Sequence, residues 1–125
     1  MTDPRHICAV IPTYNNGGTV ADVVRGVLRQ GLPVLVVDDG STDDTQEKLK
    51  GLDIQVLKHE TNRGKGRALK TGLEAARKLG YRFALTLDAD GQHDPADIPA
   101  LVAAAGERTL VVGSRNIAEI GRAHV

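Results

Sequence analysis

Two aspartates, Asp88 and Asp90, directly follow an apolar run and are the residues of this chain best suited to chemistry. The run, residues 83–87, predicts a buried strand, and alternate residues of an extended segment point the same way. Both carboxylates can therefore aim at one point beyond the strand. Paired carboxylates suit a hard divalent cation, Mg²⁺ or Mn²⁺, whose remaining ligands are water and phosphate oxygens. We expect a metal site acting on a diphosphate; the structural alternative is a turn capped by Asp94.

Short apolar runs alternate with segments of helical periodicity along the chain. Apolar runs predict strands, and apolar residues at i, i+3, i+4 and i+7 predict helices. The expected strands are residues 7–11, ended by Pro12, then 34–37, 54–57, 83–87 and 110–112. The expected helices are residues 20–28, ended near Gly31, then 43–49, 68–79 and 95–105. Strands that are apolar on both faces and alternate with helices predict an α/β fold with a doubly wound, mainly parallel sheet.

Polar or glycine-rich residues follow each of the five expected strands. Ligands of such sheets bind outside the carboxyl ends of the strands, so these clusters predict one shared site. The clusters are residues 12–15, 38–41, 62–66, 88–90 and 113–115.

Asp38 and Asp39 are candidates for recognition of a nucleotide base. A carboxylate only accepts hydrogen bonds, so it suits the N–H donors of uracil or guanine and opposes the lone pairs of adenine N1 or cytosine N3. The alternative is that either aspartate only caps the helix that follows.

Asn62 and Lys65 flank a glycine-rich turn, which either only permits a tight turn or sets Lys65 and a helix N-terminus near a phosphate or ribose. Arg115 is either a solvated surface charge or a donor of charge-assisted hydrogen bonds to a diphosphate.

Gln92 has a carbonyl oxygen that could reach the metal. His93 is expected at the surface or behind the metal ligands.

Composition narrows the function classes. The chain has 125 residues and zero formal net charge, which predicts one domain and no nucleic-acid binding through bulk charge. No apolar run approaches the roughly 20 residues that span a bilayer, and the first residues lack a signal-peptide pattern. Cys8 is expected to be a small buried hydrophobe in a reducing compartment. We therefore expect a cytoplasmic protein, with a position at the cytoplasmic face of the membrane as the alternative for the full-length form.

Taken together, these motifs resemble the family 2 glycosyltransferases, which have the Rossmann-like GT-A fold of nucleotide-diphospho-sugar transferases. The motifs fall in the family's order and extend to about Asn116, and residues 88–95 are most similar to the polyprenyl-phosphate branch typified by dolichol-phosphate mannose synthase. The resemblance implies that Asp88 and Asp90 form the metal-binding DXD motif, with Gln92 alongside. It places Pro12, Tyr14 and Asp39 at the nucleoside and Arg115 at the diphosphate. The full set of expected substrate-binding residues is Pro12, Tyr14, Asn15, Asp38, Asp39, Asn62, Lys65 and Arg115.

The resemblance implies a metal-dependent, inverting transfer of a sugar from a UDP- or GDP-sugar to an acceptor, with a polyprenyl phosphate as the candidate acceptor. The cation stabilises charge on the departing nucleoside diphosphate. The sugar, the acceptor, the choice of UDP or GDP and the oligomeric state stay open. A nucleotidyltransferase is disfavoured because residues 12–18 contain no basic residue, and a HAD-type phosphatase because its aspartates follow the first strand.

The family's acceptor-binding half and catalytic base lie downstream of the motifs found here. We therefore expect residues 1–118 to be the donor-binding part of a glycosyltransferase, truncated at its carboxyl end. Residues 119–125 resemble one reading frame of a sequencing adapter and are expected to be a non-native tail. The alternative function is a catalytically incomplete fragment that binds nucleotide-sugar and metal.

Overall fold

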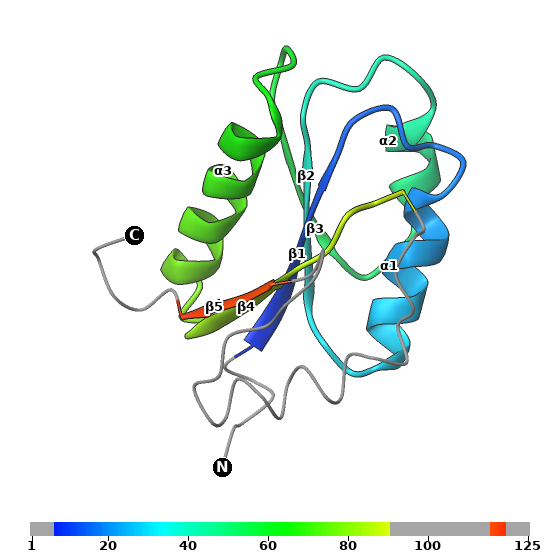
Figure 1. The fold of residues 1–125 in the computed structure, drawn as a ribbon. Coiled ribbons are helices and arrows are strands. Elements are labelled where there is room, and N and C mark those ends of the chain that lie inside the picture. Colours follow the sequence, from blue (N-terminus) through cyan, green and yellow to red (C-terminus); the bar gives the residue numbers. More distant parts are fainter. Residues whose placement is uncertain (1–6, 91–115, 120–125) are drawn as a thin grey trace.

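The structure, a computed structural model, describes residues 7–90 and 116–119 (Figure 1). These residues form three helices, namely α1 (Val20–Arg29), α2 (Thr45–Leu49) and α3 (Lys65–Lys78). They also form the strands β1 (Ile7–Thr13), β2 (Val34–Asp38), β3 (Gln55–Lys58), β4 (Phe83–Thr86) and β5 (Asn116–Glu119).

The strands form one sheet in the order β3-β2-β1-β4-β5. The first four strands of that order run parallel, and β5 pairs antiparallel with β4. The mainly parallel sheet is therefore confirmed. The strand expected at residues 110–112 and the helix expected at 95–105 lie outside the described residues. β5 was not among the strands expected from the sequence.

Helices cover both faces of the sheet, as a doubly wound fold requires. Figure 1 shows α1 and α2 on one face and α3 on the other. Alternate residues of β1 supply the two cores: Ile7 and Ile11 belong to the cluster beneath α1, whereas Cys8 and Val10 belong to the cluster beneath α3. Because alternate side chains of a strand point to opposite faces of the sheet, each side chain of β1 packs beneath either α1 or α3.

β1 continues through Pro12 to Thr13, so the expectation that proline ends this strand was wrong. The backbone groups of Ala9 and Thr13 bond toward β2, through the Ala9 N–H to the Pro33 carbonyl and the Asp39 N–H to the Thr13 carbonyl. The Val10 carbonyl bonds in the other direction, accepting from Leu87 beyond β4. Pro12 belongs to this second set, whose pairing with β4 has ended. Its missing N–H therefore removes no bond of the sheet.

Two helices begin at residues other than those expected. α2 begins at Thr45 rather than Asp43, because the Asp43 carboxylate accepts a 2.9 Å hydrogen bond from the Thr45 N–H and so precedes the first turn. α3 begins at Lys65, three residues earlier than expected, directly after Gly64, whose positive φ of 100° turns the chain into the helix.

Cys8 is buried and has no disulfide partner among the described residues. Burial raises its pKa to about 12, so the thiol stays protonated and acts as a small hydrophobic side chain, as expected. Within residues 7–90 and 116–119, no helix combines the length and apolar character needed to cross a membrane.

Candidate functional site

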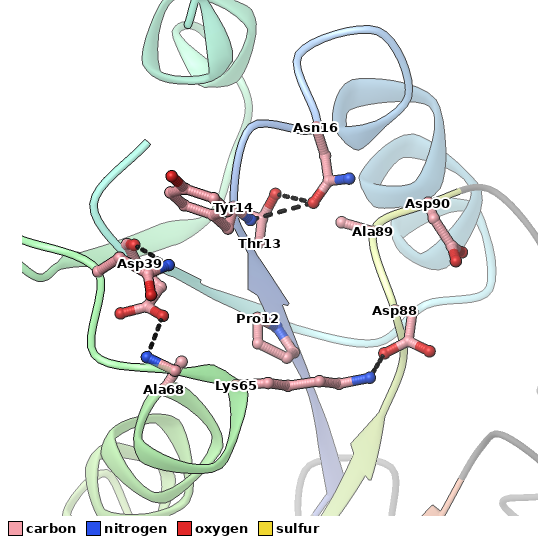
Figure 2. A pocket seen from close by; sticks show the side chains of 12 residues that line it. Pro12, Thr13, Tyr14, Asn16, Asp39, Lys65, Ala68, Asp88, Ala89 and Asp90 are labelled. Carbon is pink, nitrogen blue, oxygen red and sulfur yellow. Dashed lines mark hydrogen bonds and ion pairs between the residues drawn. The ribbon is translucent and has the colours of Figure 1, made fainter. Parts of the chain in front are cut away.

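A cavity of about 410 Å³ lies at the carboxyl ends of β1, β2 and β4, beside the first turn of α3 (Figure 2). It gathers residues from four separate stretches of the chain, as expected for a parallel sheet. Its lining residues are Pro12, Thr13, Tyr14, Asn16, Asp39, Asn62, Gly64, Lys65, Ala68, Asp88, Ala89 and Asp90.

The segment carrying Asp88 and Asp90 is anchored at its middle residue. The Ala89 carbonyl accepts a 2.5 Å hydrogen bond from the hydroxyl of Thr19, the residue that precedes α1. Ala89 is 2% exposed, whereas its two neighbours are more accessible. Burial of the middle residue thus brings both carboxylates to the rim of the cavity, where Figure 2 shows them.

The carboxylates of Asp88 and Asp90 suit a hard divalent cation. In the part of the chain that the structure describes, no group of three or more His, Cys, Asp or Glu side chains could hold a metal ion by itself. The donor set therefore fits Mg²⁺ or Mn²⁺ only when water and phosphate oxygens complete the shell. The Lys65 ammonium pairs with Asp88 across the cavity. Gln92, the third expected ligand, lies outside the described residues.

Asp39 is buried at the cavity wall, at 3% exposure, and holds the 59–64 segment in place. Its Oδ1 accepts from His59 Nδ1 at 2.7 Å and from the Arg63 N–H at 2.9 Å, and its Oδ2 accepts from the Gly64 N–H at 2.8 Å. Burial by itself raises the pKa of Asp39. The hydrogen bonds from His59 and the two backbone N–H groups lower the pKa by a larger amount, so the net shift is downward. Asp39 is therefore a carboxylate at neutral pH.

Asp38 does not line the cavity, although it was expected in the substrate-binding set. Its side chain is fully buried, with Oδ1 accepting from the Ser41 N–H at 2.9 Å and Oδ2 accepting from the Gln46 amide at 2.5 Å. Neither partner is a backbone N–H of α2, so Asp38 holds the turn at residues 38–41 and does not cap the helix that follows. The structure thus gives the two adjacent aspartates different surroundings.

Asn15 also lies outside the cavity wall and ties two loops together instead. Its Oδ1 accepts from the backbone N–H groups of Thr42 and Asp43, and its own N–H donates to the Ser41 hydroxyl at 2.8 Å. The backbone of Asn15 is left-handed, with φ of 54°. The anchored loop carries Tyr14, which is 46% exposed and lines the cavity.

Asn62 and Lys65 line the cavity as expected. The Asn62 amide donates to the Asp39 carbonyl at 3.2 Å, and Lys65 is the first residue of α3. Gly40 permits this approach, because a Cβ there would lie 2.5 Å from the Asn62 nitrogen. Arg115 lies outside the described residues.

Several lining residues were missed from sequence. Asn16 accepts hydrogen bonds from the Thr13 hydroxyl and the Tyr14 N–H, at 2.9 and 3.0 Å, and so shapes the loop after β1. Thr13 lies within the expected 12–15 cluster and Asn16 directly follows it, which was the available signal. Gly64, Ala68 and Ala89 have no side-chain chemistry by which sequence could single them out.

Residues 8–124 match the family described as Glycosyl transferase family 2. The chain is 35% identical over 129 residues to the UDP-N-acetylglucosamine–dolichyl-phosphate N-acetylglucosaminyltransferase of Methanococcus voltae, covering 87% of this chain and 51% of that protein. It is 34% identical over 119 residues to the undecaprenyl-phosphate mannosyltransferase of Micrococcus luteus, covering 89% and 49%. The chain thus spans about half the length of these curated relatives.

The fold is similar to that of a solved glucosyl-3-phosphoglycerate synthase from Mycobacterium tuberculosis, crystallised with Mn²⁺, uridine diphosphate and phosphoglyceric acid. The TM-score is 0.68 at 28% identity, and the match covers 79% of this chain and 38% of that one.

Proposed function

The chain belongs to glycosyl transferase family 2, and we propose that it binds the nucleotide-sugar donor for a metal-dependent transfer of a sugar to a polyprenyl phosphate. The observation that carries the proposal is the single cavity that joins Tyr14, Asp39 and Lys65 with Asp88 and Asp90. A base-recognition group, a cation for phosphate and a carboxylate pair for metal are the elements that a nucleoside diphosphate requires.

The two ends of the cavity would take different parts of the donor. Tyr14 and Asp39, after β1 and β2, would hold the nucleoside, with Pro12 and Asn62 beside them. Asp88 and Asp90 would hold Mg²⁺ or Mn²⁺, with Gln92 as a further predicted ligand. The cation, when bound, supplies charge stabilisation for the departing nucleoside diphosphate. Lys65 and the predicted Arg115 would add positive charge beside the phosphates.

The acceptor assignment rests on the curated relatives, whose names specify dolichyl and undecaprenyl phosphates. A lipid phosphate is already an anionic nucleophile, so direct displacement with inversion at the sugar needs no general base. We propose that the whole protein acts at the cytoplasmic face of the membrane. Because the chain spans about half of those relatives, we propose that this chain alone binds the donor and metal without completing transfer.

Replacing both metal-binding carboxylates tests the proposal. Asp88→Asn with Asp90→Asn should abolish Mn²⁺-dependent binding of nucleoside diphosphates in calorimetry, while circular dichroism shows an unchanged fold. The matched control, Asp22→Asn with Asp53→Asn, removes two negative charges from exposed positions away from the cavity and should leave binding unchanged. Unchanged metal dependence in the Asp88/Asp90 variant would reject the metal assignment.

A further inference from the structure

The outward side of α3 carries an excess of positive charge. Ala68, Gly72 and Ala76 recur every four residues and are buried, so they mark the side of the helix that packs on the sheet. Four exposed basic residues fall within an arc of about 100° on the opposite side, at 3.6 residues per turn. This basic face of α3 consists of Arg67, Lys70, Arg77 and Lys78. Glu74 is the single acidic residue of the helix.

Neighbouring carboxylates do not neutralise the basic face. Within residues 7–90 and 116–119, none of its four side chains forms an ion pair. Around α1 and α2, in contrast, Arg25 pairs with Asp22 and Lys48 pairs with Asp44. Because the whole chain has zero formal net charge, the basic face makes the charge distribution uneven. Such a one-sided cluster favours a partner with an extended negative surface.

The basic face begins beside the candidate donor site. Lys65 and Ala68 both line the cavity, and Arg67 lies between them in the first turn of α3. Figure 1 shows α3 on the side of the sheet opposite α1 and α2. A flat partner that covers the basic face would therefore reach the end of the helix at which the cavity lies.

We infer that the basic face of α3 docks on the anionic surface of a phospholipid bilayer. Clustered Lys and Arg side chains are attracted to the negative headgroups of the cytoplasmic leaflet, with a gain of about fivefold in affinity per residue. The choice of a bilayer rests on the proposed function, because a polyprenyl-phosphate acceptor is held in the membrane. Docking through this face brings the cavity close to the headgroup layer, where the phosphate of such an acceptor lies.

The composition of α3 favours a bilayer over a nucleic acid. Proteins that bind single strands add aromatic side chains on which the bases stack, and readers of duplex DNA commonly add Asn or Gln. α3 contains no aromatic residue, Asn or Gln. Apart from its cations, the helix therefore offers nothing that recognises a base, whereas cations alone suffice for a bilayer surface.

Co-sedimentation with vesicles tests the docking on the unmodified chain. At low salt, the chain should bind vesicles made of equal parts phosphatidylcholine and phosphatidylglycerol and should not bind vesicles of phosphatidylcholine alone. Raising the salt to about 1 M, where the Debye length is about 3 Å, should release the chain. Absence of binding to the anionic vesicles, or equal binding to both kinds, would overturn the inference. Tighter binding to an oligonucleotide of the same phosphate concentration would also overturn it, in favour of a nucleic acid.

A double substitution tests whether α3 is the docking surface. Lys70→Gln with Lys78→Gln removes two cations while keeping good helix formers, and should weaken binding to the anionic vesicles by about 25-fold. Arg25→Gln with Lys48→Gln is the matched control, because it changes the net charge equally on the other side of the sheet. The control should bind the vesicles like the unmodified chain. Equal weakening in both folded variants would show that overall charge, and not α3, attracts the bilayer.

Nucleotide binding separates this inference from the proposed donor site. Neither Lys70 nor Lys78 lines the cavity, so calorimetry with UDP and Mn²⁺ should give the same affinity for their double variant as for the unmodified chain. An unmodified chain that binds UDP but not anionic vesicles would overturn the docking and leave the donor site standing. A chain that binds the vesicles but no nucleoside diphosphate would overturn the donor site alone.

Discussion

The Lys65 ammonium pairs with the Asp88 carboxylate across the mouth of the cavity (Figure 2). The Lys65 side chain is 66% exposed and that of Asp88 is 28% exposed, so the pair is only partly shielded from water. Such pairs contribute about 0–1 kcal/mol. If Asp88 binds a divalent cation, that cation must compete with Lys65 for the same carboxylate.

Competition of this kind predicts opposite effects of one substitution on two ligands. In Lys65→Met, the affinity of the nucleotide-free protein for Mn²⁺ should rise by up to about fivefold, because no ammonium opposes the cation. Affinity for UDP should fall, because a positive charge near the diphosphate is lost. Calorimetric titrations with Mn²⁺ alone and with UDP measure the two effects separately.

Lys70→Met provides the control for this pair of measurements. Lys70 is exposed on the same helix and does not line the cavity, so both affinities should match those of the unmodified chain. Loss of Mn²⁺ affinity in Lys65→Met would show that Lys65 supports the cation rather than competing with it.

The loop clamp at Asn15 predicts a loss of nucleotide affinity from a residue outside the cavity. Asn15→Gly tolerates the left-handed backbone but removes the bonds to the N–H groups of Thr42 and Asp43. Tyr14 should then be held less firmly, and affinity for UDP should fall by roughly threefold to tenfold. Asn15→Ala should lose a similar factor and also about 1–2 kcal/mol of folding free energy, because its φ becomes strained.

Binding calorimetry and urea unfolding separate these two effects. Asp22→Ala, at an exposed position of α1, serves as the reference and should change neither. Full UDP affinity in Asn15→Gly would show that the loop needs no clamp to place Tyr14.

The sequence was sufficient to predict which edge of the sheet carries the site. It was not sufficient to predict which individual side chains point into the cavity. Asp39 and Asp88 meet at one cavity because parallel strands deliver their carboxyl ends to one side, which follows from alternation of strands and helices. Consecutive residues leaving a strand point in opposite directions, so only one of Asp38 and Asp39 could face the cavity. Which one does so depends on the turn at residues 38–41, where the Ser41 N–H binds Asp38.

Contacts between residues far apart in the chain could not be predicted from the sequence pattern either. Asn15 was assigned to the substrate because it ends a strand, yet its partners Thr42 and Asp43 lie in the following loop. β5 was not predicted because residues 116–119, Asn-Ile-Ala-Glu, contain no run of apolar residues that would indicate a buried strand. His59 lies in no recognised motif, and its role emerges only from contact with Asp39 and Thr71.

The depressed pKa of Asp39 predicts a specific pH dependence of stability. Because the carboxylate is stabilised in the folded state, its contribution is full above the ordinary pKa of 3.8 and is lost as the pH falls through the lower folded value. Asp39→Asn cannot titrate, so its deficit should be on the order of 2 kcal/mol at neutral pH and should shrink in acid. Urea unfolding of both proteins across the acid range measures this difference. A deficit that is the same at every pH would mean that hydrogen bonds to the charged form contribute nothing.

The close packing of Gly72 in α3 against the sheet predicts that a larger residue at this position destabilises the protein. A Cβ at this position would lie 2.4 Å from Val10 Cγ1 and 3.0 Å from Val37 Cγ2, and both valines are fully buried. Valine has little freedom to move aside, so Gly72→Ala should push α3 away from the sheet and cost about 1–2 kcal/mol despite the better helix propensity of alanine.

Gly66, in the first turn of the same helix, is the matched control. A Cβ there meets nothing within 4 Å, so Gly66→Ala should stabilise the protein by about 0.5–1 kcal/mol. Urea unfolding of the two variants should therefore move in opposite directions. Because α3 carries Lys65 and Thr71, Gly72→Ala should also weaken UDP binding, whereas equal stabilisation by both substitutions would show that α3 does not pack on β1 and β2 through this glycine.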